Sequence, residues 1–298
     1  MRHLLRAADL TRTDVEALLS RAAALQDALA KSRPPHPLSG RIVANLFFEN
    51  STRTRMSFER AAKALGAEVL NFAPASSSVT KGETLLDTVL NVDALGPIAI
   101  VIRHGASGAA ALVAKKVRAA VINGGDGTHE HPSQALLDAF TLREKLGSLE
   151  GKRVAIVGDI LFSRVARSNI HILKLLGASV VVSGPPTLLP MGVAALGCDV
   201  TPHFDSALEG ADAVMMLRVQ LERQAEAFFP SAREYARYYG LNSARAARLK
   251  DSAVVLHPGP MNRGVEIAPD VADGTRSLIL GQVANGVAMR MAILEWCS

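Results

Sequence analysis

The stretch IVANLFFENSTRTR, residues 42–55, contains the transition that organises the first half of the chain. Its first seven residues are almost all apolar, which is typical of a strand buried on both faces of a parallel sheet. A carboxylate, three hydroxyls and two guanidinium groups follow, and residues 56–65 then have helical spacing and end at Gly66. Free backbone N–H groups and the positive end of a helix dipole meet at such a transition. The sequence therefore predicts an oxyanion site, for phosphate in the first place.

The simpler interpretation of residues 51–55 is an ordinary N-cap followed by exposed arginines. Capping accounts for one hydroxyl, but not for three hydroxyls that alternate with two arginines after a carboxylate. The glycines of a GxxxxGK[ST] nucleotide-binding loop are absent, so the side chains themselves must supply the donors. We therefore favour anion binding by these side chains.

Composition places the chain among soluble globular enzymes. It has 298 residues, of which 49% are hydrophobic and 20% charged, enough for one large or two ordinary domains. No apolar run approaches the roughly 20 residues of a membrane span, and the first residues lack the apolar core of a signal peptide. Cys198 and Cys297 lie far apart without a CxxC pair, which indicates a cytoplasmic protein without a structural zinc site.

Charge and aromatic content bear on the partners. The formal net charge is +5, aromatic residues make up only 4%, and no block of lysine and arginine occurs. Nucleic-acid binding normally needs a basic patch or stacking aromatics. We therefore expect small anionic substrates, with no nucleic acid and no membrane as partners.

The order of the predicted elements indicates an α/β fold. Thr13 and Glu16 form a predicted capping box at the start of a helix that extends to about Ala30. From Arg41 onward strands and helices alternate, and a second such series opens with the apolar strand 153–159. This pattern predicts two domains, each a mainly parallel sheet flanked by helices and built from right-handed crossover units.

The domain boundary is predicted where a helix runs into a glycine-rich segment near residues 141–150. The first domain then comprises residues 1–143 and the second residues 144–278. The last segment, 279–298, is apolar on most of its surface, so it is expected to be a helix that packs back on the first domain.

Polar side chains follow the predicted strands, where ligands bind in parallel α/β sheets. A glycine-rich loop, 123–134, leads into a helix and is expected to let the backbone approach a ligand closely. The remaining candidates share this position after a strand: Lys81, Arg103, His131, Gln134, Arg164, Arg218, Gln220 and the turn His257-Pro258-Gly259-Pro260.

Two other kinds of site fit the sequence less well. His129-Glu130-His131 could begin a zinc site, but a third ligand at suitable spacing is missing. The segment 158–164 resembles the first turn of a dinucleotide fold but lacks GxGxxG. We therefore expect no metal and no cofactor. With several cationic groups and no nucleophile–base pair, the candidates suit two anionic substrates and a reaction that needs positioning and charge stabilisation.

These motifs identify the sequence as similar to the catalytic chains of aspartate carbamoyltransferases, over nearly its whole length. The resemblance rests on motifs in the order and spacing of that family: Ser51-Thr52-Arg53-Thr54-Arg55, Lys81-Gly82-Glu83-Thr84, Arg103-His104, His131-Pro132-Ser133-Gln134, the segment 218–223 and His257-Pro258-Gly259-Pro260. The first motif alone would mark only the wider aspartate/ornithine carbamoyltransferase superfamily. The implied reaction, a step of pyrimidine biosynthesis, transfers a carbamoyl group from carbamoyl phosphate to L-aspartate.

The resemblance also implies a role for each residue. The phosphate is expected on Ser51, Thr52, Arg53 and Thr54, the carbonyl oxygen on Thr54, Arg103 and His131, and the carbamoyl amide on Gln134. Arg164 is expected to take the α-carboxylate of aspartate, Arg218 and Gln220 its β-carboxylate, and the carbonyls of Gly259 and Pro260 the amine. Glu49 is expected to pair with Arg164 and Arg223 when the domains close. Ser77 and Lys81 would enter the site of a neighbouring subunit, which implies a homotrimer.

Two alternatives remain at this point. An ornithine or other amino-acid carbamoyltransferase is the first. Ornithine carbamoyltransferases share the carbamoyl phosphate half, but they typically have His-Cys-Leu-Pro at the last turn and lack the Lys-Gly-Glu-Thr loop. A catalytically silent structural homologue in a pyrimidine-pathway complex is the other, although none of the charged site residues is missing. Regulatory or dihydroorotase-like partner chains are also compatible with the resemblance.

Overall fold

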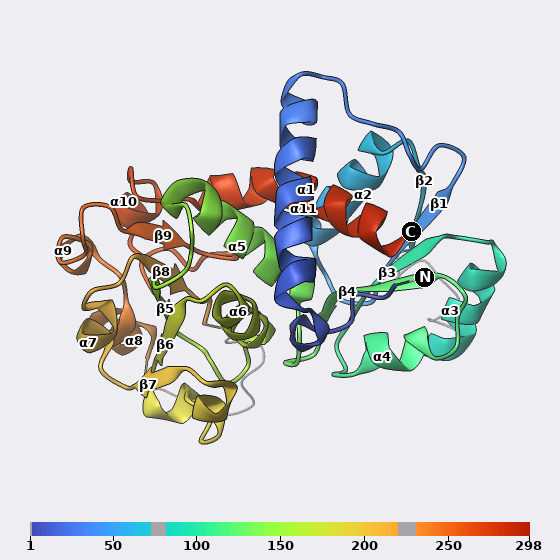
Figure 1. Cartoon of the computed structure of the whole chain (residues 1–298). Helices are drawn as coiled ribbons and strands as arrows, with labels where there is room; N and C mark the ends of the chain where they lie inside the picture. The colour runs from blue at the N-terminus through green and yellow to red at the C-terminus, as the bar shows by residue number, and fades with distance from the viewer. Residues whose placement is uncertain (1, 73–81, 220–230) are drawn as a thin grey trace. The chain divides into compact units, whose positions relative to one another are not determined.

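The computed structural model of the chain describes residues 2–72, 82–219 and 231–298 (Figure 1). Four predicted site residues, Ser77, Lys81, Gln220 and Arg223, lie outside the described residues. The chain divides into two compact units. Unit 1 comprises residues 1–140 and 283–298, and unit 2 comprises residues 141–282.

Unit 1 is built on a four-stranded parallel sheet in the order β2-β1-β3-β4. The strands are β1 (Ile42–Phe47), β2 (Glu68–Phe72), β3 (Ala99–His104) and β4 (Ala120–Asp126). The helices of this unit are α1 (Arg12–Ala30), α2 (Thr52–Ala64), α3 (Leu85–Ala94) and α4 (Ala109–Ala114), together with most of α5 (Pro132–Leu146) and α11 (Ile279–Cys297), which cross into unit 2. A short 3-10 helix, η1 (Ala7–Asp9), precedes α1.

Strands β1, β3 and β4 of unit 1 are largely buried, as their apolar residues predict, whereas the edge strand β2 is partly exposed. One face packs under α3 and α4 in a core of Ala44, Leu46, Val89, Ile100, Ile102, Ala110, Val113, Ala119 and Val121. Helix α2 packs along β1 and β2, with Phe58 fully buried. Helix α11 returns to this unit, where Glu295 pairs with Arg21 of α1 at 2.6 Å and Asn285 accepts a hydrogen bond from Gln26.

Unit 2 has a five-stranded parallel sheet in the order β7-β6-β5-β8-β9. Its strands are β5 (Arg153–Val157), β6 (Ser179–Ser183), β7 (Asp199–Thr201), β8 (Ala213–Met216) and β9 (Val254–Leu256). Its further helices are α6 (Arg164–Leu175), α7 (Phe204–Leu208), α8 (Ala232–Tyr239), α9 (Ser243–Ala246) and α10 (Pro269–Ala272), with 3-10 turns η4 (Pro186–Leu188) and η5 (Val193–Leu196). The α/β fold predicted from the alternating elements is confirmed.

Each sheet has one point at which the strand order reverses. In unit 1 it lies between β1 and β3, because β2 is added on one side of β1 and β3 on the other. In unit 2 it lies between β5 and β8. Ligands of open parallel sheets bind at the carboxyl ends of the strands beside this switch point. The loops after β1, β3, β5 and β8 are therefore the expected positions of ligand-binding residues.

Two local predictions were wrong. The cap of α1 is Thr11 and not Thr13: its hydroxyl accepts from Asp14 N, and the Asp14 carboxylate accepts from Thr11 N, both at 3.1 Å. The glycine-rich segment predicted as a loop from residue 123 belongs to β4 as far as Asp126. None of the helices in the described ranges is long and apolar enough to cross a lipid bilayer.

Candidate active site

The first switch point places the predicted phosphate loop at the carboxyl end of β1. Helix α2 starts at Thr52, and the Ser51 side chain makes no capping hydrogen bond to the first turn. Ser51 therefore occupies the N-cap position, but its side chain does not cap the helix. Thr54 is buried, whereas Thr52 and Arg53 are exposed. This first turn presents hydroxyl, guanidinium and backbone N–H donors at the positive end of a helix dipole, an arrangement suited to an anion.

Across the same switch point, Arg103 lies at the carboxyl end of β3, in register with Phe47 of β1. Its Nε is 3.4 Å from Oε2 of Glu49, and the side chains are only 16% and 24% exposed. Its Nη1 donates a hydrogen bond to Gly124 O over 3.4 Å. The guanidinium is therefore held between the segment that follows β1 and the end of β4.

The loop after β4 supplies His131 and Gln134 at the start of α5. Both side chains are largely buried, and His131 Nδ1 lies 3.4 Å from the Ser133 hydroxyl. Gln134 Nε2 donates to Asp138 Oδ1 at 2.8 Å, one helical turn along α5. This bond fixes the orientation of the amide and assigns its nitrogen to Asp138. The amide oxygen is left to accept from an NH₂ group.

Arg290 of α11 is a buried cation close to this helix. Its guanidinium lies 5.1 Å from the centre of the Phe58 ring, and Nη1 donates to Gly286 O at 3.1 Å. Burial lowers the pKa of Arg290 to about 10, an effect that the negative charge of Asp138 partly opposes. Asp138 therefore interacts with a buried cation as well as with the Gln134 amide.

In unit 2 the two predicted aspartate-binding arginines flank the second switch point. Arg164 is the first residue of α6, after β5, and is 6% exposed. Arg218 follows β8, and the two strand ends approach closely at Gly158. A Cβ on Gly158 would lie 2.8 Å from Leu217 O, and its φ of +133° favours glycine. Glycine is thus required for the close approach of these two strand ends.

The turn after β9 is held by hydrogen bonds that lead to a buried carboxylate, Glu266. Gly259 N donates to His257 Nδ1 at 2.8 Å, and His257 Nε2 lies 3.2 Å from Glu266 Oε1. Glu266 Oε1 also accepts from Asn262 N at 2.5 Å, and Asn262 Nδ2 donates to Val219 O at 3.1 Å. One carboxylate thus links the turn that bears Gly259 with the residue that follows Arg218.

Three carboxylates at the candidate site were missed by the sequence analysis: Asp138 and Glu266, described above, and Asp126, which accepts from Gly108 N in the loop after β3. A signal existed for one of them, since Gln134 and Asp138 have the i, i+4 spacing at which side chains meet on a helix. The other two bond residues of neighbouring loops, and sequence spacing alone does not reveal such contacts. Among the described residues, no group of three or more His, Cys, Asp or Glu side chains is arranged to hold a metal ion.

Comparison with known proteins agrees with this geometry. A family model described as "Aspartate/ornithine carbamoyltransferase, carbamoyl-P binding domain" matches residues 2–144, and the corresponding "Asp/Orn binding domain" model matches residues 150–297. The "Aspartate carbamoyltransferase catalytic subunit" of Myxococcus xanthus is 64% identical over 298 residues and is covered over 100% of both chains. The subunit of that name from Acidothermus cellulolyticus is 59% identical, covering 99% of this chain and 91% of the relative.

Solved structures are similar in fold. The crystal structure of Trypanosoma cruzi aspartate transcarbamoylase with carbamoyl phosphate has a TM-score of 0.89 and 32% identity, covering 98% of this chain and 95% of that one. The complex of the same enzyme with N-(phosphonacetyl)-L-aspartic acid also has a TM-score of 0.89, and it covers 98% and 94%.

The two parallel-sheet units with arginines at both switch points define a two-substrate α/β transferase. The chain belongs to the aspartate/ornithine carbamoyltransferase family. The relatives compared above all have the name of the aspartate branch, so the resemblance found in the sequence is confirmed.

Proposed function

We propose that the chain transfers the carbamoyl group of carbamoyl phosphate to the α-amine of L-aspartate, giving N-carbamoyl-L-aspartate and phosphate. One observation supports this most strongly: cationic side chains flank the switch point of each sheet, Arg53 and Arg103 in unit 1 and Arg164 and Arg218 in unit 2. Two anionic substrates, one for each sheet, suit this arrangement. The relatives at 55–64% identity have the name of this enzyme.

In the proposed site, residues 1–143 with the helix 279–298 bind carbamoyl phosphate, and residues 144–278 bind aspartate. The phosphate lies on Ser51, Thr52, Arg53 and Thr54, together with Ser77 and Lys81 of a neighbouring subunit in a homotrimer. The carbonyl oxygen accepts from Thr54, Arg103 and His131. Gln134 takes the carbamoyl amide, and its fixed amide orientation supports this role, because a free oxygen is what an NH₂ group needs.

The amine of aspartate attacks the carbamoyl carbon as the uncharged base, so a C–N bond forms and the carbonyl becomes a tetrahedral oxyanion. The bond from carbon to the phosphate oxygen then breaks, and the leaving phosphate takes a proton from the amine. No protein nucleophile is needed. The chain contributes charge stabilisation and positioning, for which preorganised donors are suited.

Specificity for aspartate over ornithine follows from charge. Arg164 and Arg218 suit two carboxylates, with Gln220 and the carbonyls of Gly259 and Pro260 as further ligands. The cationic side chain of ornithine would meet like charge beside Arg218. A catalytically silent homologue would be expected to have lost charged site residues, and this chain retains them.

A colorimetric assay for carbamoyl-aspartate on the purified chain tests the activity, and replacing aspartate with ornithine tests the competitor. We expect product when aspartate is the second substrate and none when ornithine replaces it. Carbamoyl-ornithine as the main product would overturn the assignment, and no product with either would favour the silent homologue. Light scattering on the chain tests the homotrimer, and mixing with candidate regulatory or dihydroorotase-like chains tests larger assemblies. We also propose a cytoplasmic location, which fractionation of cells would check.

A further inference from the structure

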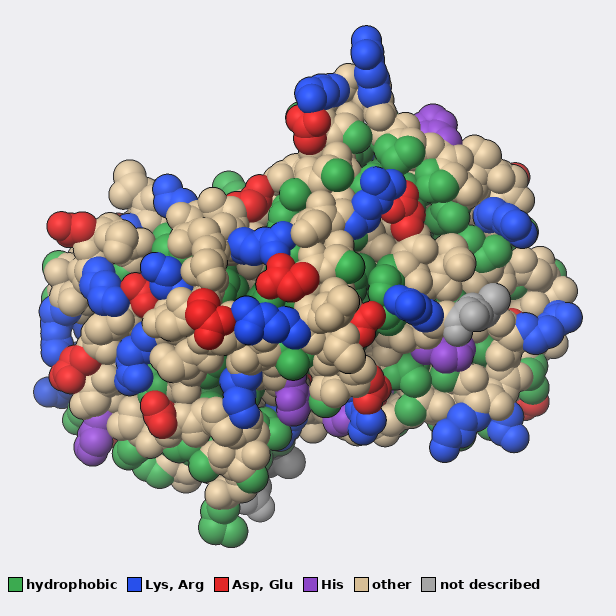
Figure 2. Space-filling model, viewed as in Figure 1, with side chains coloured by type: hydrophobic (Ala, Val, Ile, Leu, Met, Phe, Trp, Pro, Cys, Tyr) green, Lys and Arg blue, Asp and Glu red, His purple; other side chains and the backbone are tan. Residues whose placement is uncertain are grey.

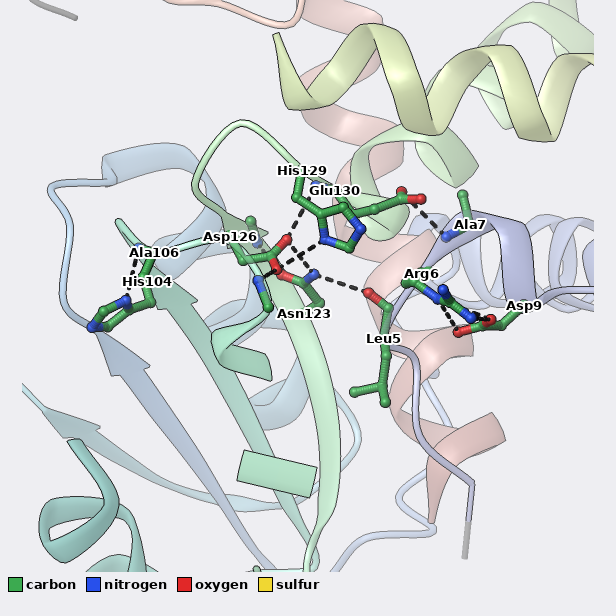
Figure 3. A network of polar contacts seen from close by, with 12 residues as sticks. Leu5, Arg6, Ala7, Asp9, His104, Ala106, Asn123, Asp126, His129 and Glu130 are labelled. Atoms are coloured by element: carbon green, nitrogen blue, oxygen red, sulfur yellow. Dashed lines mark hydrogen bonds and ion pairs between the residues drawn. The ribbon is translucent and has the colours of Figure 1, made fainter. Parts of the chain in front are cut away.

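Asp126 joins the loop after β3 to the loop after β4 (Figure 3). It is the last residue of β4 and is 2% exposed. Its Oδ2 accepts from Gly108 N at 2.6 Å, in the loop that follows Arg103 and His104. Its Oδ1 accepts from Glu130 N at 3.1 Å, directly before His131. A single carboxylate therefore bonds the backbones of two loops that supply proposed substrate ligands.

A bulge in β4 brings this carboxylate into position. The ladder pairs Ile102 with Asn123 and then His104 with Asp126, so β4 has one residue more than β3 over this interval. Residues three apart on a regular strand point to opposite faces. Because of the bulge, Asn123 Nδ2 instead donates to Asp126 Oδ1 at 2.9 Å. The extra residue is accommodated at Gly125, whose φ is +116°.

The carboxylate is fully used in holding the loops. Besides the two backbone N–H groups and Asn123, it meets His129 Nδ1 at 3.1 Å (Figure 3). An ionised carboxylate has about four lone-pair positions, and these four partners occupy them. The amide of an asparagine has only one oxygen, so its NH₂ group would face donors instead of accepting from them.

The two loops also touch through their backbones. Gly127 N donates to His104 O at 2.9 Å. A Cβ on Gly127 would lie 2.6 Å from Ser107 N, so this junction leaves no space for a side chain. From the side of the N-terminal segment, Leu5 O accepts from Asn123 and Ala7 N donates to Glu130 (Figure 3). A shift of one loop against the other is thereby resisted on several sides.

We propose that Asp126 is a positioning residue for carbamoyl transfer. By holding the two loops together it sets the separation of the Arg103 guanidinium and the His131 imidazole. This inference rests on the proposed function, in which both groups donate to the carbonyl oxygen of carbamoyl phosphate. Donors of an oxyanion must lie about 2.7–3.1 Å from it, and a misplacement of about 1 Å can cost about 100-fold in rate.

Asp93 offers a matched control within the same unit. It is 7% exposed and accepts from the backbone N–H groups of Arg118 and Ala119 at 3.2 and 3.0 Å. These residues precede β4, so Asp93 ties a loop at the amino ends of the strands, away from the proposed ligands. Asp126→Asn and Asp93→Asn remove the same charge from comparable bonds, and only the first lies beside the site.

Steady-state kinetics with both substrates, together with thermal melting, test the proposal. We expect Asp126→Asn to lower kcat by about 100-fold and to raise KM for carbamoyl phosphate, with KM for aspartate within about twofold of wild type. Asp93→Asn should lower Tm but leave all three constants near wild type. An Asp126→Asn chain that folds and has wild-type constants would overturn the inference, as would equal changes in both variants.

A milder variant covers the case in which Asp126→Asn does not fold. His129 is 39% exposed at its side chain, so His129→Ala should fold while removing one of the four partners of the carboxylate. We expect a severalfold fall in kcat and a higher KM for carbamoyl phosphate alone. Wild-type constants for His129→Ala would then overturn the proposal. Failure of the proposed function is distinguishable, because the wild-type chain would itself form no carbamoyl-aspartate.

Discussion

The imidazole of His257 and the carboxylate of Glu266 form a buried pair, with Nε2 3.2 Å from Oε1 and both side chains 0% exposed. Because Gly259 N donates to His257 Nδ1, that nitrogen has no proton, and the proton of the neutral ring is on Nε2. The ring therefore donates to Glu266. The pair fixes the turn whose carbonyls are proposed to receive the amine of aspartate.

The first prediction concerns Glu266→Gln, which keeps the shape of the side chain but removes its charge. Hydrogen bonds to charged groups contribute about 1.5–3 kcal/mol, so we expect KM for aspartate to rise by about tenfold or more. KM for carbamoyl phosphate should change little. Asp212→Asn is the control in the same unit, since Asp212 accepts from Arg153 N at 2.8 Å at the amino end of β5. Equal effects of the two variants on KM for aspartate would contradict the prediction.

The second prediction concerns Arg53, at the first turn of α2. Removing one donor of an oxyanion site elsewhere costs about 100- to 1,000-fold in kcat. We expect a loss of that size for Arg53→Ala in the carbamoyl-aspartate assay, with little change in Tm because the side chain is exposed. Lys63→Ala on the same helix is the control, because Lys63 pairs with Glu59 at the surface. Near-normal turnover of Arg53→Ala would show that the phosphate site is assigned wrongly.

Much of this architecture is predictable from the sequence because the strands of parallel sheets are apolar runs with polar residues at their carboxyl ends. Leu46 and Ile156 lie in such runs, and Arg103 and Arg218 follow others. Strand β7 (Asp199–Thr201) was not predicted, because it is short, lies at the sheet edge and is partly polar. The cap at Thr11 was missed because its partner is Asp14, whereas the motif sought had Glu or Gln.

The missed part of the site has a common cause. Asp126 was assigned to a loop because two glycines precede it, although they form a bulge within a paired strand. Glu266 lies nine residues after His257, and nothing in a single sequence indicates that their side chains meet. Contacts between loops depend on the strand order, which periodicity does not give.

On the face shown in Figure 2, acidic and basic side chains are interspersed, in keeping with the absence of a basic block in the sequence.

The third prediction concerns Cys297, at the end of α11. Burial raises the pKa of this thiol to about 12, against 9.0 for the free group. As pH rises, the Cys297 thiol therefore ionises in the unfolded chain before it ionises in the folded chain. Its contribution to the free energy of unfolding is present below pH 9 and is lost between about pH 9 and 12. We expect Cys297→Ala to flatten the fall in the free energy of unfolding above pH 9 relative to wild type, as measured by denaturant titration. An identical slope in both chains would contradict the assigned pKa.

The same thiol reports on folding. The thiolate is the reactive form, and with a pKa near 12 its fraction at pH 8 is about a thousandfold below that of a free thiol. Cys297 is also 0% exposed. Alkylation with iodoacetamide should therefore be slow in the native chain and fast in denaturant. Rapid native labelling at Cys297, identified by peptide mass analysis, would contradict the burial.

The last prediction concerns Glu49, whose Oε2 lies 3.4 Å from Arg103 Nε. A carboxylate beside an anion site must be stabilised by cations, and Arg103 supplies one. The prediction that Glu49 pairs with Arg164 and Arg223 when both substrates are bound adds a second function, that of favouring a closed state. Glu49→Gln removes the charge on which the pairing with Arg103 and the closed state both depend. We expect a smaller change in small-angle scattering on adding N-(phosphonacetyl)-L-aspartate, and a higher KM for aspartate.

One control variant and a comparison of two measurements separate the possible functions of Glu49. Glu59→Gln is the control, because Glu59 lies on α2 and pairs with Lys63 at the surface. It should leave the scattering change intact. If Glu49 acts only on Arg103, Glu49→Gln should alter KM for carbamoyl phosphate and leave the scattering change at its wild-type size. An unchanged scattering response with normal kinetics for both substrates would rule out a closure function, and Glu49 would then be a surface charge without a part in the reaction.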